Sequence, residues 1–303
     1  MTPPDEFDPP VGEAEELAPD LRRVLAPNPS PMTYRGTNTY LVGRRALAVI
    51  DPGPDNPAHL EAILAALTPG QRISHIFVTH AHLDHSPLAV SLSRVTGAPV
   101  LAYGAAHAGR SEVMQGLAAT GLVGGGEGVD AGFSPDHCLK DGEVTPGDGW
   151  SITAHWTPGH FGNHMSFTWN NMAFCGDLVM GWASSLVSPP DGDLTDFRAS
   201  CQRLAALKPA VLHTGHGAPV ADPDARIAWL LAHRQTREEA ILAALRDTAR
   251  TAAEVTRAVY TDTPRALLPA AERNVLAHLV DLHQRARVAP QGQLSESSRF
   301  QLI

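Results

Sequence analysis

Three histidines and one aspartate lie within six consecutive residues, and side chains of these two types are common metal ligands. The four are His80, His82, Asp84 and His85. They follow a short apolar run at residues 73–79, which predicts a strand, so they belong to a loop in which several side chains can turn toward one ion. Neutral imidazole and carboxylate suit Zn²⁺, with iron and manganese as alternatives. The spacing therefore predicts a metal site at the end of a strand.

Three later segments complete a pattern that occurs in one known family. They are Thr157-Pro158-Gly159-His160, Cys175-Gly176-Asp177 and Thr214-Gly215-His216-Gly217, and each follows a strand-like run. The four motifs in this order resemble those of the metallo-β-lactamase-fold hydrolases. The motifs that carry the resemblance span about residues 34–220.

The resemblance implies a four-layer αββα sandwich of the α/β class and a site for two metal ions. In that family pattern one ion is held by His80, His82 and His160, the second by Asp84, His85 and His216, and Asp177 bridges the two. Five imidazoles and two carboxylates leave open positions on both ions, as a catalytic site requires and a closed structural site does not. Two adjacent cations generate a hydroxide at neutral pH and polarise the bond that it attacks.

Details of the motifs favour one branch of the family. Oxygen-reducing diiron members have Glu where His82 stands, and the zinc β-lactamases usually have Cys where Asp177 stands. Glutathione-thioester hydrolases share all seven ligands, but their C-terminal substrate contacts find no match here. The β-lactamase-like protein 2 group fits best, through the GTNTYLVG segment near the start, the His233-Arg234 pair and a winged-helix-like C-terminal domain. With these features the resemblance extends over about residues 21–288.

Two residues near the motifs, His164 and Trp182, have two interpretations each. His164, four positions after His160, either orients a metal ligand or is a hydrogen-bonded histidine at a strand edge. Met180 and Trp182 follow the bridging aspartate and would border the substrate pocket by resemblance, while core packing explains Trp182 equally well. Cys175 and Cys201 are predicted to be small buried apolar residues.

The elements that must position these motifs follow from apolar patterning. Strands are predicted at residues 37–42, 46–50, 73–79, 150–157, 165–169, 172–175 and 211–214, and helices at 56–67, after 86 and at 196–207. Because consecutive strands from 150–157 to 172–175 have no helices between them, we expect an antiparallel sheet in that half of the chain. A glycine-rich loop is predicted at residues 121–132.

The predicted organisation has three parts. Residues 1–20 form an acidic, proline-rich lead-in expected to be mobile, residues 21–233 the catalytic domain and residues 234–303 the winged-helix-like domain. The net charge of −9 divides into −11 for residues 1–233 (13 basic, 24 acidic) and +2 for residues 234–303 (10 basic, 8 acidic). Three cysteines argue against a disulfide framework, and the chain shows no signal peptide or membrane span, so a cytoplasmic location is expected.

These features predict a metal-dependent hydrolase of an ester, thioester or lactone, acting on a small-molecule or carrier-bound acyl substrate. Asp84 would bind metal and take a proton from the attacking water. Endoribonuclease action on RNA at the same site is the alternative, although an acidic core offers few contacts to phosphates. A nucleic-acid-binding module with a structural metal is a third hypothesis. A homodimer is left open, and no membrane partner is expected.

Overall fold

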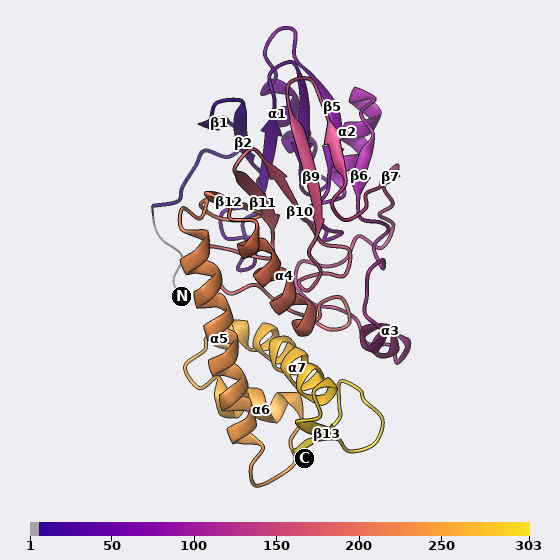
Figure 1. Ribbon diagram of the computed structural model, residues 1–303, viewed down its shortest axis with the longest axis vertical. Coiled ribbons are helices and arrows are strands. Elements are labelled where there is room, and N and C mark those ends of the chain that lie inside the picture. The colour runs from indigo at the N-terminus through magenta and orange to yellow at the C-terminus, as the bar shows by residue number, and fades with distance from the viewer. Residues whose placement is uncertain (1–5) are drawn as a thin grey trace.

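Two β-sheets lie face to face at the centre of the computed structural model, which describes residues 6–303 (Figure 1). The first sheet has seven strands in the order β1 to β7. Their bounds are β1 (Ala14–Ala18), β2 (Leu21–Leu25), β3 (Asn38–Val42), β4 (Ala46–Ile50), β5 (Arg72–Phe77), β6 (Val100–Ala102) and β7 (His137–Cys138). Pairing is antiparallel from β1 to β4 and parallel from β4 to β7.

The second sheet has five strands in the order β12-β11-β10-β9-β8. Their bounds are β8 (Val144–Pro146), β9 (Ser151–Trp156), β10 (Met165–Trp169), β11 (Met172–Gly176) and β12 (Val211–Thr214). The pairs from β8 to β11 are antiparallel, as expected, whereas β12 runs parallel to β11. The chain between β11 and β12 contains α4 (Leu194–Ala206), and such a crossover allows a parallel pair.

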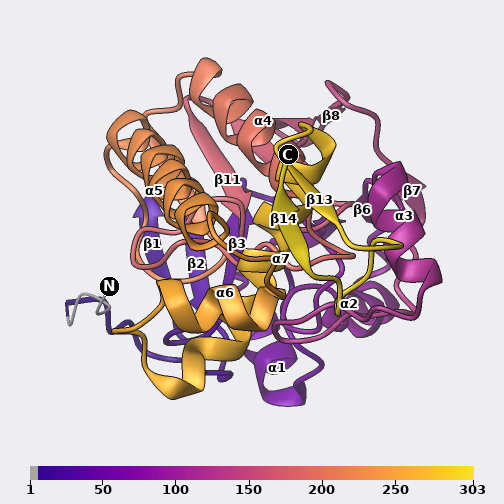
Figure 2. The same cartoon turned by 90° about the horizontal axis from the view of Figure 1, so that it is seen from below.

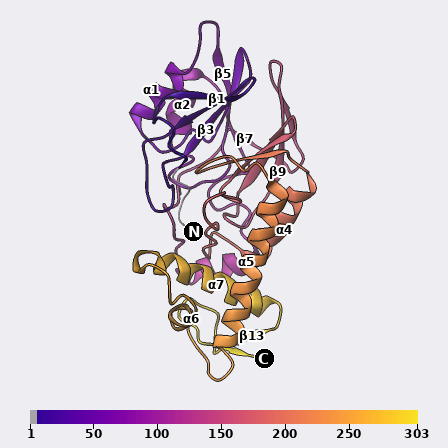
Figure 3. The ribbon, with the colours of Figure 1, turned by 90° about the vertical axis from the view of Figure 1, so that its left-hand side faces the viewer.

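Helices cover the outer face of each sheet (Figure 3). α1 (Pro57–Ala65) and α2 (Leu88–Thr96) pack on the first sheet, and α4 and the start of α5 (Pro223–Ala244) pack on the second. Apolar side chains on both faces of β4 require a covering layer on each side. Leu47 and Val49 face the helices, whereas Ala48 and Ile50 face the other sheet. A strand buried on both faces is typical of such a layered core. The predicted αββα sandwich is confirmed.

The C-terminal region lies across one end of the sandwich (Figure 2). It contains the second half of α5, then α6 (Ala252–Val259), the short 3-10 helix η1 (Arg265–Leu267), α7 (Leu268–Gln284) and a hairpin of β13 (Val288–Pro290) with β14 (Phe300–Leu302). The Thr251 hydroxyl accepts from the Glu254 backbone nitrogen, and the Glu254 carboxylate accepts from the Thr251 backbone nitrogen. This capping box fixes where α6 begins. α3 (Glu112–Ala119), from the first half of the chain, contributes Met114 and Leu117 to the same hydrophobic cluster.

One segment differs from the expectation drawn from its sequence. The acidic lead-in, expected to be mobile, contains β1, which extends the first sheet, and Glu15 forms an ion pair of 2.5 Å with the buried Arg23. Phe7 is also buried and lies against Arg23, whose guanidinium carbon is 4.7 Å from the ring centre. Residues 1–5 of the lead-in lie outside the described residues.

Across residues 6–303, helix length and hydropathy together identify no segment able to cross a membrane.

Candidate metal centre

The seven predicted ligands all lie in loops that follow strands. The six-residue stretch comes after β5, His160 lies in the loop between β9 and β10, Asp177 directly follows β11, and His216 lies just beyond β12. Strands from both sheets therefore end at one place, and their loops bring together side chains that are far apart in the sequence.

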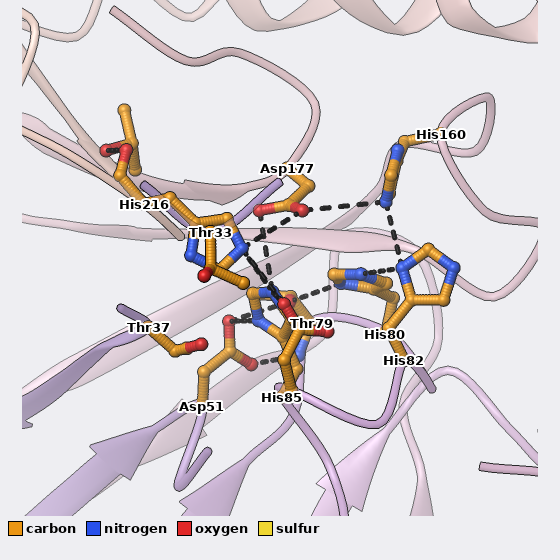
Figure 4. A network of polar contacts seen from close by, with 12 residues as sticks. Thr33, Thr37, Asp51, Thr79, His80, His82, His85, His160, Asp177 and His216 are labelled. Carbon is orange, nitrogen blue, oxygen red and sulfur yellow. Dashed lines mark hydrogen bonds and ion pairs between the residues drawn. The ribbon is translucent and has the colours of Figure 1, made fainter. Parts of the chain in front are cut away.

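The seven side chains form two groups that share Asp177 (Figure 4). The first is His80, His82, His160 and Asp177, and the second is Asp84, His85, Asp177 and His216. Within each group the candidate ligand atoms lie within 4.8 Å of one another, and all of these residues are buried. This division matches the one that the resemblance implies, and the role of each residue as a ligand stays a prediction.

In the first group three imidazole nitrogens converge. His80 Nε2 lies 2.9 Å from His82 Nδ1, and His160 Nε2 lies 3.1 Å from the same atom. Asp177 Oδ2 completes the group at 3.7 Å from His160 Nε2.

In the second group two carboxylates face two imidazoles. His216 Nε2 lies 3.1 Å from Asp84 Oδ2 and 3.3 Å from Asp177 Oδ2. His85 Nε2 lies 3.2 Å from His216 Nε2 and 3.5 Å from Asp177 Oδ1.

The outer nitrogen of several rings fixes which atom faces the centre. His160 Nδ1 donates to the Leu186 carbonyl at 2.7 Å, and His216 Nδ1 donates to the Gly36 carbonyl at 3.1 Å. A carbonyl only accepts, so in the neutral ring the proton lies on Nδ1 and Nε2 keeps its lone pair. His85 Nδ1 is 2.9 Å from Asp51 Oδ2, which orients that ring in the same way.

These contacts make the centre a good fit for divalent cations. Lone pairs and carboxylate oxygens face one another at hydrogen-bond distance, an arrangement that a cation between them stabilises. Asp84 Oδ1 and Asp177 Oδ1 are buried without a hydrogen-bond partner among residues 6–303. Nitrogen and oxygen donors without a thiolate suit Zn²⁺, iron or manganese.

The electrostatics of the two groups differ. In the first group burial lowers the pKa of His82 to about 3, with His160 adding to the effect, so its imidazole is neutral and able to bind metal. In the second group burial lowers the pKa of His216, but the carboxylates of Asp177 and Asp84 outweigh burial and raise it to about 10. The second group therefore attracts positive charge.

Two glycines permit the close approach of these loops. A Cβ on Gly215 would lie 2.3 Å from Asp177 Oδ1, and a Cβ on Gly159 would lie 2.3 Å from the backbone of Phe197. Gly159 also has a φ of +135°, which side-chain-bearing residues rarely adopt. The glycines of the two motifs therefore allow neighbouring segments to contact the metal loops directly.

The centre forms part of the lining of a cavity of about 280 Å³. His82, Asp84, His160, Asp177 and His216 are among its lining residues. Met180 and Trp182, predicted to border a pocket, also line it. Trp182 is in addition packed against Tyr34, with 5.2 Å between ring centres, so it serves both the cavity and the core.

The family of the chain follows from comparison with known proteins. Residues 32–216 match the metallo-beta-lactamase superfamily, and residues 251–297 match the beta-lactamase associated winged helix domain. The chain belongs to the metallo-β-lactamase superfamily. It is a hydrolase of that superfamily, whose members typically bind two metal ions, and the two groups described above are able to hold them.

Three proteins illustrate how this superfamily member relates to others. It is 32% identical over 244 residues to an atrochrysone carboxyl ACP thioesterase of Paecilomyces divaricatus, covering 78% of this chain and 68% of the relative. It is 28% identical to the beta-lactamase-like protein 2 homolog of Caenorhabditis elegans, covering 88% and 84%. A metallo-beta-lactamase family protein of Thermus thermophilus has a TM-score of 0.75 and 26% identity, covering 95% of this chain and 100% of that structure.

His164 lies beside the metal centre and makes no hydrogen bond to any of the seven predicted ligands. Its ring centre is 5.2 Å from that of His80, its Nδ1 is 3.0 Å from Thr157 Oγ1, and its buried Nε2 has no partner among the described residues. Cys175 and Cys201 are buried free thiols, as predicted.

Asp51 is a residue of the site that the sequence analysis missed. It directly follows β4, has a φ of 51°, and accepts hydrogen bonds from the Thr79 backbone nitrogen and the Thr79 hydroxyl, and it contacts His85. One signal was available: β4 and β5 were both predicted strands, and a carboxylate at the end of a neighbouring strand lies close to the metal loop.

Proposed function

We propose that this chain hydrolyses acyl thioesters presented on a carrier arm, with two divalent metal ions that we predict to be Zn²⁺. The observation that carries the proposal is the convergence of two nitrogen and oxygen donor groups, sharing Asp177, beside one cavity. The relatives named as acyl-carrier thioesterases support a carrier-bound acyl substrate over other acyl compounds.

In this proposal the chain's own residues bind metal, orient the substrate and move a proton. When bound, the two ions lower the pKa of a water and polarise the substrate carbonyl. Asp84 Oδ2 faces His216, whereas Oδ1 is unpartnered and free to accept a proton from the attacking water. As the C–O bond forms the C–S bond breaks, and the proton is passed to the leaving thiolate, which gives a carboxylic acid and a thiol.

The apolar part of the cavity lining suits an acyl group. Met180, Trp182 and Leu186 contribute apolar surface beside the metal loops, and Met32 adds more from the N-terminal segment. Apolar walls bury a hydrocarbon or aromatic acyl chain and reduce the access of bulk water to the reacting carbonyl. The same walls provide few cationic groups for a polyanion.

RNA cleavage at the same centre is the alternative, and the experiment must distinguish it from thioester hydrolysis. Binding a single strand depends on several contacts to phosphates, and residues 1–233 have a net charge of −11. This imbalance favours an acyl substrate. Simple esters and lactones are further arms of the test, because the same centre would attack their carbonyls.

The experiment is a paired assay of the metal-loaded protein. Acyl thioesters of pantetheine and of an acyl carrier protein are followed by thiol release, and a labelled single-stranded RNA is followed by gel electrophoresis, each with and without a chelator. We expect thioester hydrolysis that the chelator abolishes and added Zn²⁺ restores. Chelator-sensitive RNA cleavage without thioester hydrolysis would overturn the proposal, and so would turnover in a protein shown to be metal-free.

A further inference from the structure

The C-terminal region supplies its own part of the cavity wall. Residues of three elements contribute: Arg234 and Arg237 of α5, Tyr260 and Thr263 at and just after the end of α6, and Asn274 of α7. This part of the lining brings nitrogen donors to a cavity that also has the carboxylates of Asp84, Asp177 and Glu127 in its wall.

Two of the basic side chains in the lining have other contacts. His233 stacks on Trp229, with ring centres 5.0 Å apart, and burial with the neighbouring arginines lowers its pKa to about 4, so it is neutral. Arg234 is buried and donates to Asn274 Oδ1 at 2.8 Å and to the Ser185 carbonyl. His233 therefore carries no positive charge, and the Arg234 guanidinium is buried and already donates to these two neutral acceptors.

Arg237 is different. Its guanidinium carbon lies 4.5 Å from the centre of the Tyr260 ring, a cation–π contact that holds the group over the ring. No carboxylate among residues 6–303 pairs with it, because Glu238, its neighbour in sequence, already binds Arg198 and Arg285. The half-buried Arg237 therefore lines the cavity with its charge uncompensated by the protein.

Two hydroxyl groups lie in the same part of the lining. Neither the Tyr260 phenol nor the Thr263 hydroxyl makes a hydrogen bond to the described residues, although both residues line the cavity. A flat guanidinium with nearby hydroxyl donors matches the oxygens of a phosphate, to which arginine donates two parallel bonds.

We propose that Arg237, Tyr260 and Thr263 form a phosphate subsite that binds the phosphopantetheine arm of the thioester. The inference rests on the function proposed above and names the part of the substrate that the C-terminal region recognises. Every thioester of coenzyme A or of a carrier protein has a phosphate on its thiol arm, whatever its acyl group. One uncompensated guanidinium suits one such phosphate, whereas an RNA strand requires several.

The first test measures binding without catalysis. S-methyl phosphopantetheine and S-methyl pantetheine differ only in the phosphate, and the methyl group removes the free thiol that would otherwise bind metal. Calorimetry should show the phosphorylated compound binding roughly tenfold more tightly or better, the scale of a charge-assisted hydrogen bond. Arg237→Gln should abolish this preference and Arg237→Lys should keep part of it.

A matched control is Arg257→Gln, which changes an exposed arginine of α6 outside this cavity. It should leave the phosphate preference unchanged. Equal binding of the two compounds by the wild-type protein would overturn the subsite, as would a preference that persists in Arg237→Gln while that variant keeps its melting temperature. Arg237-dependent binding of single-stranded RNA, with no binding of the phosphorylated arm, would overturn the subsite and assign the Arg237 guanidinium to RNA.

A second test separates the subsite from the activity. Hydrolysis of acyl-phosphopantetheine and acyl-pantetheine is compared, and then acyl-coenzyme A is compared with acyl carrier protein to distinguish the two sources of the arm. Hydrolysis at equal kcat/KM with and without the phosphate overturns the subsite and leaves the proposed function standing. Arg237-dependent binding of the arm without hydrolysis of any thioester supports the subsite and overturns the proposed function.

Discussion

Asp84 has two oxygens in different surroundings, and this difference gives it a distinct place among the seven predicted ligands. Oδ2 lies 3.1 Å from His216, whereas Oδ1 is buried without a partner among residues 6–303. Burial raises the pKa of this carboxyl, but His85 and His216 outweigh burial and lower it to about 2, so it is ionised at neutral pH. A carboxylate with one free oxygen is equipped to accept a proton.

Asp84→Asn should therefore abolish hydrolysis without unfolding the protein. The amide keeps the shape of the side chain but neither accepts the proton nor provides the charge, and we expect kcat to fall by roughly 100-fold or more. Thiol release and thermal melting are the measurements. Asp55→Asn, at an exposed aspartate, is the matched control and should behave as wild type. Wild-type turnover by Asp84→Asn would remove Asp84 from the mechanism.

The residues of the site differ in how far the sequence predicts them. Asp84 lies in a dense local motif after a predicted strand, so its type and spacing predicted a place near a metal, whereas His160 was assigned to the same centre through the family resemblance. Arg237 and Tyr260 come from two helices, and their contact with each other and with the cavity depends on how the C-terminal region packs. Local patterns do not contain this information.

At the scale of elements, α5 and α7 hold the loop that orients one predicted ligand. Arg234 of α5 donates to the Ser185 carbonyl, and Asn274 of α7 accepts from the Val187 backbone nitrogen at 3.1 Å. Between these two points the Leu186 carbonyl accepts from His160 Nδ1 at 2.7 Å. The C-terminal helices therefore support the metal centre through one short loop.

Arg234→Gln should weaken metal binding although Arg234 lies on another element. The shorter side chain loses the bond to Ser185, so the loop and His160 are less well fixed, and we expect an affinity about tenfold lower, in the range found when groups behind a ligand are changed. Competition with a chromogenic chelator measures the affinity. Arg257→Gln is the control, and unchanged affinity in Arg234→Gln would contradict this account.

The sequence predicted some of the strands and missed others, among them the largely buried β2 and the buried β6 as well as the largely exposed β1 and the exposed β7. The apolar runs of β4, β9 and β10 predicted strands because both faces of each strand are largely buried. β1 is exposed or half-buried and β7 has two exposed residues, so neither has an apolar pattern. They are strands because the neighbouring strand offers backbone partners, and pairing of this kind is a tertiary effect.

At the scale of the whole molecule, acid stability depends on a buried histidine of the C-terminal region. His278 of α7 is fully buried, and neither ring nitrogen has a partner among the described residues. Burial, with Arg234 and Arg198 nearby, holds its pKa well below the usual value of about 6.5. Below pH 6.5 the unfolded chain takes up a proton that the folded chain excludes, so stability decreases as the pH falls.

His278→Leu should reduce this loss of stability in acid. A neutral side chain of similar volume has no proton to gain on unfolding, so the decrease in unfolding free energy between pH 7 and pH 5 should be smaller than in wild type by about 2 kcal/mol. Urea denaturation at the two pH values measures the difference. The same pH dependence in both proteins would contradict the assignment to His278.

A single helix belongs to two hydrophobic clusters, and this has a thermodynamic consequence. Ile227 and Leu230, in the first half of α5, pack with α4 and the second sheet, whereas Ile241, in its second half, packs with α6 and α7. The boundary that we predicted between residues 233 and 234 falls within this helix. If either cluster melted alone, the other cluster would lose the part of α5 that packs in it. Calorimetry should therefore record one cooperative transition with equal calorimetric and van't Hoff enthalpies. Two separate peaks would contradict this.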